Sequence, residues 1–125
     1  SIHPTGVNKK WTVKHCQSWR CLVKADLARK ASFTPGVNYQ DVPWWAEILL
    51  NVKKTTITRL PLYYYYPNPG SFVMSAKQDR HIHSLRVIIE QSDKIFETAT
   101  PEQRKAWNLN FRNSFSRYLE KKLNR

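Results

Sequence analysis

The chain has 125 residues, of which 41% are hydrophobic and 13% are aromatic. This aromatic content excludes a mostly disordered chain, and the length predicts one domain with a single core. No stretch offers the ~20 apolar residues that a membrane-spanning helix needs. Two cysteines make no disulfide framework and the first residues lack the apolar core of a signal peptide, so we expect an intracellular setting, whether cytoplasmic, nuclear or organellar.

Charge is the strongest signal in the composition. Twenty-one Lys and Arg stand against nine Asp and Glu, which gives a formal net charge of +12 that both halves of the chain share. A field of this sign attracts polyanions and accelerates their encounter with the protein. We therefore expect nucleic acid, either DNA or RNA, as the partner. An acidic protein and an anionic lipid surface are the alternatives.

Residues 1–10 contain Pro4, Gly6 and the pair Lys9-Lys10 and show no periodicity. This predicts a basic arm ahead of a domain over residues 11–125. Some arms of this kind enter a nucleic-acid groove, although more often they are frayed ends.

The segment 11–31 is expected to be helical in its second half, with Ser18 as a possible cap. Four large apolar residues recur there at positions i, i+3, i+4 and i+8, the period of a helix. They are Trp19, Leu22, Val23 and Leu27. The Thr-Pro-Gly sequence at residues 34–36 should end this segment.

A second short helix is expected to open at residues 41–43, where Asp-Val-Pro is found. Apolar residues then repeat at helical intervals: Trp45, Ile48, Leu49 and Val52. Lys53 and Lys54 fall in the expected last turn, where cations suit the helix dipole. Trp44 lies beside the apolar stripe, so it either completes the core or forms an exposed anchor.

Residues 55–60 are rich in β-branched side chains and alternate, which predicts a strand. Pro61 limits that strand to an edge position or ends it. Four tyrosines follow at residues 63–66, ahead of a Pro-Asn-Pro-Gly sequence that cannot be helical. Because side chains alternate along an extended chain, we expect one pair of tyrosines to be buried and the other displayed. Tyr64 and Tyr66, or the opposite pair, could stack on unpaired bases.

Residues 75–125 carry the clearest helical signals. Ser75 and Gln78 have the spacing of a capping box, and Thr100, Pro101 and Gln103 repeat such a start. Apolar side chains follow each start at three- and four-residue intervals, most clearly Leu85, Ile89, Phe96, Trp107, Phe111, Phe115, Leu119 and Leu123. Two helices joined by a short loop predict an antiparallel αα-hairpin.

The expected fold is therefore a mainly α, single-domain protein with a long C-terminal αα-hairpin and a short edge-strand and Tyr-Pro segment. The predicted core residues are Trp45, Ile48, Leu49, Val52, Leu85, Ile89, Phe96, Trp107, Phe111 and Leu119.

The last expected helix also carries a cationic face. Its cations are Arg104, Lys105, Arg112, Arg117, Lys121, Lys122 and Arg125, with only Glu102 and Glu120 opposing them. A solvated charged face is the usual explanation of such a run. Cations in such excess repel one another unless a negatively charged partner is near, so the run also indicates a binding face.

The His-Ile-His triplet at residues 81–83 resembles the metal-binding motif of the HUH endonucleases, which nick single-stranded DNA. In that family two histidines on a strand hold Mg²⁺ or Mn²⁺, and a downstream tyrosine attacks the scissile phosphate. Tyr118, with lysines three and four residues later, looks like the family's Tyr-x-x-Lys arrangement. The resemblance implies metal ligands at His81 and His83 and a catalytic Tyr118. The helical spacing from residue 82 onward opposes it, because positions 81 and 83 of a helix point about 200° apart.

A zinc site is a further alternative, although no second close pair completes it. Its candidate ligands are His15, Cys16, Cys21, His81 and His83. A free cysteine on an apolar stripe is more often a small buried hydrophobe. Paired carboxylates and Gly-rich phosphate loops do not stand out, so we expect no cofactor and a binding protein rather than an enzyme.

The preferred function is non-catalytic nucleic-acid binding, as a transcription or replication accessory factor or a ribonucleoprotein subunit, through backbone contacts. The expected contact residues are Lys9, Lys10, Lys53, Lys54, Arg59, Tyr64, Tyr66, Arg112, Arg117, Lys121 and Lys122. The first alternative is a structural subunit of a larger protein assembly, in an organelle or elsewhere in the cell, whose aromatic residues form interfaces. The HUH-like nicking enzyme is the second.

Overall fold

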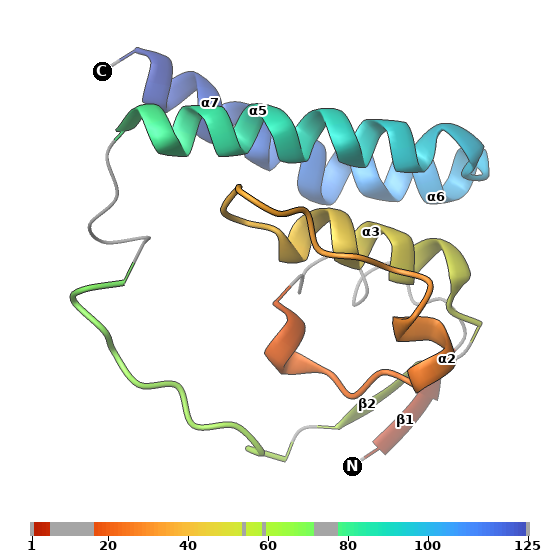
Figure 1. Ribbon diagram of the computed structural model, residues 1–125. Coiled ribbons are helices and arrows are strands. Elements are labelled where there is room, and N and C mark those ends of the chain that lie inside the picture. The colour runs from red at the N-terminus through yellow and green to blue at the C-terminus, as the bar shows by residue number, and fades with distance from the viewer. Residues whose placement is uncertain (1, 6–16, 54, 59, 72–77, 125) are drawn as a thin grey trace.

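The computed structural model describes residues 2–5, 17–53, 55–58, 60–71 and 78–124, and it is mainly helical, which confirms the predicted class (Figure 1). The longer helices are α3 (Asp41–Asn51), α5 (Gln78–Ile95), α6 (Pro101–Trp107) and α7 (Asn113–Leu123). The shorter elements are β1 (Ile2–Thr5), the 3₁₀ turn η1 (Ser18–Arg20), α2 (Ala25–Ala28), β2 (Thr55–Thr58), the 3₁₀ turn η2 (Phe96–Thr98) and the π-helical segment η3 (Asn108–Arg112). Among these described helices, none is long and apolar enough to cross a bilayer.

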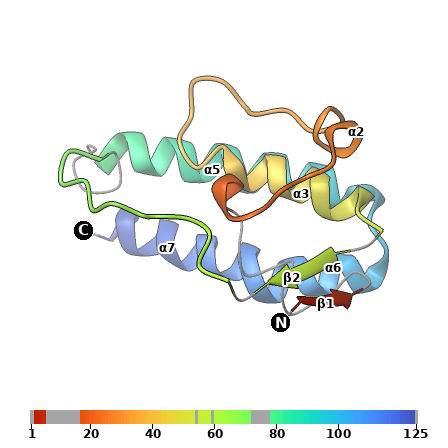
Figure 2. The same ribbon diagram turned by 90° about the horizontal axis from the view of Figure 1, so that it is seen from below.

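α5 and the continuous run of α6, η3 and α7 lie side by side in opposite directions (Figures 1 and 2). The direction is also evident from one contact, because Gln78 at the start of α5 donates its side-chain N–H to the carbonyl oxygen of Lys122 near the end of α7. The capping box predicted over residues 75–78 is not tested, because Ser75 lies outside the described residues. This helical pair forms the upper layer in Figure 1.

The start of α6 confirms the second predicted capping box. The Thr100 hydroxyl oxygen accepts from the Gln103 amide at 3.1 Å, and the Gln103 side-chain oxygen accepts from the Thr100 amide at 3.0 Å. Pro101 occupies the first turn, where a missing N–H costs nothing. The π-helical segment that follows α6 was not expected from the spacing of the apolar residues.

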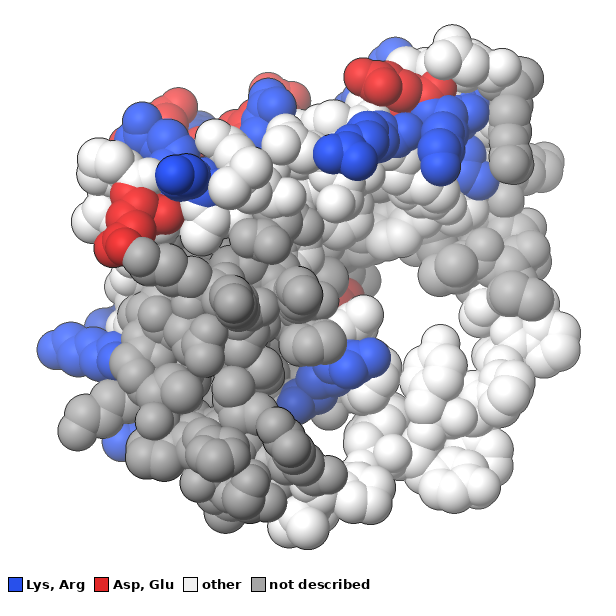
Figure 3. All heavy atoms as spheres, turned by 180° about the vertical axis from the view of Figure 1, so that it is seen from behind, with Lys and Arg blue, Asp and Glu red and all other residues white. Residues whose placement is uncertain are grey.

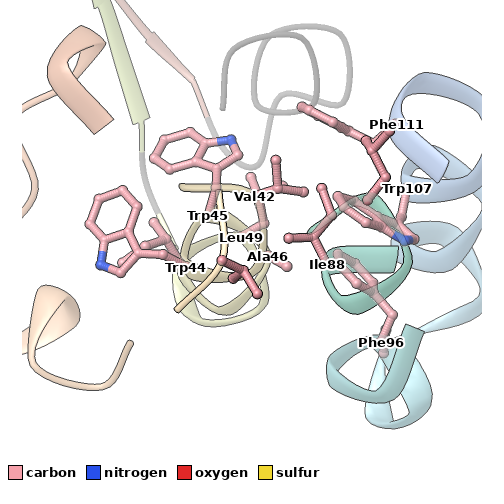
Figure 4. Packing of buried hydrophobic residues seen from close by; sticks show 13 residues of the cluster. Val42, Trp44, Trp45, Ala46, Leu49, Ile88, Phe96, Trp107 and Phe111 are labelled. Carbon is pink, nitrogen blue, oxygen red and sulfur yellow. The ribbon is translucent and has the colours of Figure 1, made fainter. Parts of the chain in front are cut away.

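α3 packs beneath α5 and closes the core (Figure 4). Trp45, Ile48 and Leu49 are buried in one cluster with residues of α5 and of the aromatic stack described next. The complete buried cluster is Val37, Val42, Trp44, Trp45, Ala46, Ile48, Leu49, Leu85, Ile88, Phe96, Ala99, Trp107 and Phe111. Val52, Ile89 and Leu119, which the sequence also placed in the core, are only partly buried.

An aromatic stack runs along the hairpin end of this core. Trp107 lies between Phe96 and Phe111, with ring centroids 4.7 and 5.1 Å away, and Phe111 stacks on Phe115 at 5.8 Å. Trp44 is buried as well, with 7% exposure, and stacks on Phe33 at 5.3 Å. The core alternative for Trp44 therefore holds, and the exposed-anchor alternative is wrong.

The helix expected in the second half of residues 11–31 is much shorter than predicted. Only η1 and the single turn α2 form there, and Leu22 between them is fully exposed. Ser18 does not act as the expected cap, because its amide and hydroxyl both donate to the Asp41 carboxylate, at 3.0 and 3.2 Å. The chain does turn at residues 35–36, where Gly36 adopts a φ of 77° that favours glycine.

The two strands pair antiparallel, with Ile2 opposite Thr58 and Thr5 opposite Thr55. Part of the arm expected over residues 1–10 is therefore a strand, and Lys9 and Lys10 lie outside the described residues. α3 ends at Asn51, so Lys53 follows the helix and does not occupy its last turn as predicted. Lys54 is not among the described residues.

Candidate interaction surface

Residues 60–66, which we call the strap, lead from the region of β2 to a turn at residues 69–70 without regular secondary structure. Figure 1 shows this segment as a drawn-out trace that arches away from the helices, and an opening separates the two in Figure 3. Its large side chains are mostly exposed: Leu60 60%, Leu62 74%, Tyr63 57%, Tyr64 76%, Tyr65 72% and Tyr66 73%. The expectation that one pair of tyrosines is buried is therefore wrong.

The four tyrosines alternate between two sides of the strap. Tyr63 and Tyr65 both stack on Trp19, with ring centroids 4.5 and 5.4 Å away. Tyr64 and Tyr66 contact each other, with centroids 4.5 Å apart and rings tilted by 41°. Side chains two residues apart share one side of an extended backbone. Leu60 and Leu62 occupy even positions like Tyr64 and Tyr66. We therefore assign them to the row of side chains that does not contact Trp19.

Trp19 is a platform held by the helical core. It belongs to η1, and its neighbour Ser18 is bonded to Asp41 at the start of α3. The Arg20 guanidinium lies 4.9 Å from the Trp19 ring centroid, a cation–π contact that adds to the stack. The core thus positions one row of the strap through Asp41, Ser18 and Trp19 and leaves the other row facing outward.

The cationic face predicted on the C-terminal helix is interrupted by acids of α5. Arg112 donates from Nε to both carboxylate oxygens of Asp93, at 2.8 and 3.1 Å, and this pairing raises the pKa of Arg112. Arg104 donates to the carbonyl oxygens of Glu97 and Ala99 at the hairpin turn. These two side chains therefore bond to other parts of the same chain. The sequence of the helix alone did not indicate this.

Charges of both signs are consequently mixed over the helical pair, as Figure 3 shows. A shallow groove beside α7 has three acids and two cations along it: it is lined by Arg86, Ile89, Glu90, Asp93, Lys94, Glu97 and Leu119. Arg117 and Lys121 are exposed, whereas Lys122 is half-buried with its Nζ 5.3 Å from the Tyr118 ring centroid. Arg59 is not among the described residues.

His81 and His83 do not share a metal site, so the arrangement implied by the HUH resemblance is wrong here. Both lie on α5, where His81 is buried with 2% exposure and His83 is exposed. His81 Nδ1 lies 2.6 Å from the Tyr39 hydroxyl. Burial lowers the pKa of His81, and the charge of Lys122 lowers it further.

Tyr118 also belongs to this network. Burial raises the pKa of Tyr39, and a hydrogen bond with Tyr118 raises it further. The network joins the loop before α3 to α5 and α7, so its role is structural. Across the described part of the chain, no three His, Cys, Asp or Glu residues come together as a metal site.

Cys21 is a half-buried thiol whose Sγ lies 3.6 Å from the Ser18 carbonyl oxygen. Burial raises the pKa of this thiol, which disfavours the thiolate that a zinc site needs. The other proposed ligands near it, His15 and Cys16, fall outside the described residues.

The residues that sequence reasoning missed are Trp19, as the platform, and Leu60 and Leu62, as members of the outward row. The signal was present, because Leu, Leu, Tyr and Tyr occupy four consecutive even positions from 60 to 66. Only the burial pattern shows that the side chains of this row are mostly exposed. No protein-family model matches the sequence, and no curated protein or solved structure proves similar to it.

Proposed function

We propose that this protein is an interaction subunit of a larger protein assembly and that the strap is its contact with a partner protein. One observation carries the proposal: six large apolar side chains in seven consecutive residues are mostly exposed to water. Together they offer on the order of 800 Å². This is about what one partner contributes to a standard protein–protein interface.

The helical body does not need the strap. The buried cluster consists of residues from α3, α5 and the C-terminal helices with the adjoining loops, and no strap residue belongs to it. Exposing Leu and Tyr in water forgoes about 1.5–3 kcal/mol for each large side chain that could be buried. A partner that covers the strap recovers this free energy, which favours stable association.

The test replaces three residues of the outward row, Leu62, Tyr64 and Tyr66. Affinity-tagged wild type, expressed in its native cells and extracted under native conditions, should elute from gel filtration at high mass. The variant Leu62→Ser/Tyr64→Ser/Tyr66→Ser should elute near the mass of the free tagged chain. The matched control Leu22→Ser/Leu109→Ser/Leu123→Ser removes three other exposed apolar side chains and should behave as wild type. Wild type that elutes as a monomer contradicts the proposal.

Nucleic-acid binding is the second candidate, because nine acids cannot neutralise twenty-one cations wherever they lie. In this proposal the exposed pair Tyr64 and Tyr66 stacks on bases. The phosphate contacts are Lys9, Lys10, Lys53, Lys54, Arg59, Arg117, Lys121 and Lys122, with Arg112 contributing only its terminal nitrogens.

This candidate predicts an affinity for a labelled single strand that falls linearly on a double-logarithmic salt plot, with a slope of about −0.7 per phosphate contacted. Arg117→Ala/Lys121→Ala should make the slope shallower by about 1 to 2. Arg29→Ala/Lys94→Ala removes the same charge elsewhere and should leave it unchanged. Weak binding that does not saturate and does not respond to these changes excludes the candidate.

A further inference from the structure

We propose that residues 62–66 bind by becoming a β-strand on the open sheet edge of the partner, an edge that carries acidic side chains. The inference rests on the proposed function and specifies how the strap is recognised. Extended segments commonly join a partner's sheet in this way: main-chain hydrogen bonds supply affinity, and alternate side chains supply specificity.

The backbone of these five residues is free to pair. Within the described part of the chain, none of the residues 62–66 makes a backbone hydrogen bond. Five residues is a common strand length, and tyrosine is enriched in strands. Pro61 and Pro67 bound the segment, and proline donates no hydrogen bond to a ladder, so the pairing is confined to the residues between them.

The side chains already have the alternation of a strand. Tyr63 and Tyr65 lie on Trp19, and Tyr64 contacts Tyr66. A segment held in its bound shape loses less conformational entropy on association. In the paired state Trp19 would cover one face of the new strand, and Leu62, Tyr64 and Tyr66 would lie over the partner's sheet.

The sign of the charge on the partner's sheet edge follows from charge complementarity. Residues 48–78 contain four cations and no acidic residue. Two described cations, Arg20 beside Trp19 and the exposed Lys53, lie on the segments next to the strap in space or in sequence. Acidic side chains along the partner's edge attract this stretch, whereas the lysines that commonly protect natural sheet edges would repel it.

A strand bonds to a neighbouring edge through every second residue, because consecutive N–H groups point to opposite edges. The amides of residues 62, 64 and 66 therefore serve one edge, and those of residues 63 and 65 serve the other. Proline removes an amide, whereas alanine at the same position removes only the side chain. The ratio between the proline and the alanine variant thus isolates the backbone contribution.

The experiment measures incorporation of the tagged full-length chain into its native assembly for Pro and Ala variants at each of residues 62 to 66. In one alternating series the proline variant should incorporate about tenfold less than its alanine counterpart, which corresponds to the loss of a buried hydrogen bond. In the other series the two variants should agree within about twofold. Circular dichroism of the isolated variants should be unchanged, since the strap is outside the core.

Equal incorporation of the proline and alanine variants at all five positions overturns the inference. That result would mean that the partner recognises side chains alone and bonds to no backbone amide. A uniform proline penalty without alternation also overturns the inference. An alternating penalty in self-association of the purified chain assigns the edge to a second copy and overturns the partner sheet. Absence of any assembly with wild type refutes the proposed function itself, which distinguishes the two failures.

A separate pair of variants tests whether the partner's edge is acidic. Lys53→Glu should reduce incorporation about tenfold, because it places like charges at the contact. Lys94→Glu makes the same charge change on the exposed side of α5 and should have no such effect. Equal effects of the two variants overturn the acidic edge.

Discussion

Two buried serines on α5 should have opposite effects on the stability of the protein. Ser84 and Ser92 have 1% and 0% exposure. The Ser84 hydroxyl accepts from the Asn38 amide at 3.0 Å, whereas the buried Ser92 hydroxyl has no hydrogen-bond partner among the described residues. A buried polar group that makes no hydrogen bond costs about 1–3 kcal/mol.

Ser92→Ala should therefore stabilise the protein by about 1 kcal/mol, and Ser84→Ala should destabilise it by about 1–2 kcal/mol. Both substitutions gain the same helix propensity, so their difference isolates the hydrogen bond. Urea denaturation followed by circular dichroism measures both free energies of unfolding. Equal changes in the two variants would show that the hydroxyl partners are not what separates them.

His81 makes stability depend on pH. Burial and the charge of Lys122 lower its pKa in the folded chain, so the unfolded chain binds the proton first as the pH falls below about 6.5. The free energy of unfolding should be constant above that pH and decrease below it, with a slope of at most about 1.4 kcal/mol per pH unit. The decrease stops once the pH is below the pKa of the folded state.

Thermal unfolding between pH 7.5 and 5 checks this expectation. His81→Gln should weaken the dependence, whereas His83→Gln, which changes an exposed histidine on the same helix, should retain it. A dependence that survives in His81→Gln and vanishes in His83→Gln contradicts the assignment.

At the scale of elements, the turn between η2 and α6 is specified by local hydrogen bonds. Thr100 and Gln103 satisfy each other's amides, and Arg104 donates to the Glu97 and Ala99 carbonyl oxygens across the turn. Such capping satisfies donors and acceptors that helix ends leave open. The reversal of the chain from α5 into α6 thus depends on a few residues around the turn.

Thr100→Ala should cost about 1 kcal/mol of stability, because it removes the cap acceptor. Thr98→Ala, two residues earlier and exposed, should change stability by less than about 0.5 kcal/mol. Chemical denaturation of the two variants provides the measurement. Equal losses would indicate that the capping box does not stabilise the turn.

For the whole molecule, the helical body and the strap should have separable effects. Ile88→Ala empties a fully buried site of the core and should cost about 2–5 kcal/mol. Leu62→Ser/Tyr64→Ser/Tyr66→Ser changes three exposed side chains and should alter the free energy of unfolding by less than about 1 kcal/mol. A large loss in the strap variant would mean that the strap supports the fold and is not reserved for a partner.

The elements that sequence determined are those with local causes. The stripe of α3, the periodic spacing of α5 and the capping box at Thr100 depend on residues within a few positions of each other. The mainly helical class follows from them. Seven of ten predicted core residues are buried for the same reason, since one face of each helix is apolar.

Tertiary contacts decided the rest. Ser18 bonds to Asp41, 23 residues away, and a short 3₁₀ turn forms where the apolar spacing indicated a helix. Asp93 on α5 pairs with Arg112 on η3, and the face that seemed cationic becomes mixed. The strap alternates as its sequence implies, but alternation specifies two sides and not which of them is covered. That depends on what the remaining chain places nearby, and here it places Trp19 on one side only.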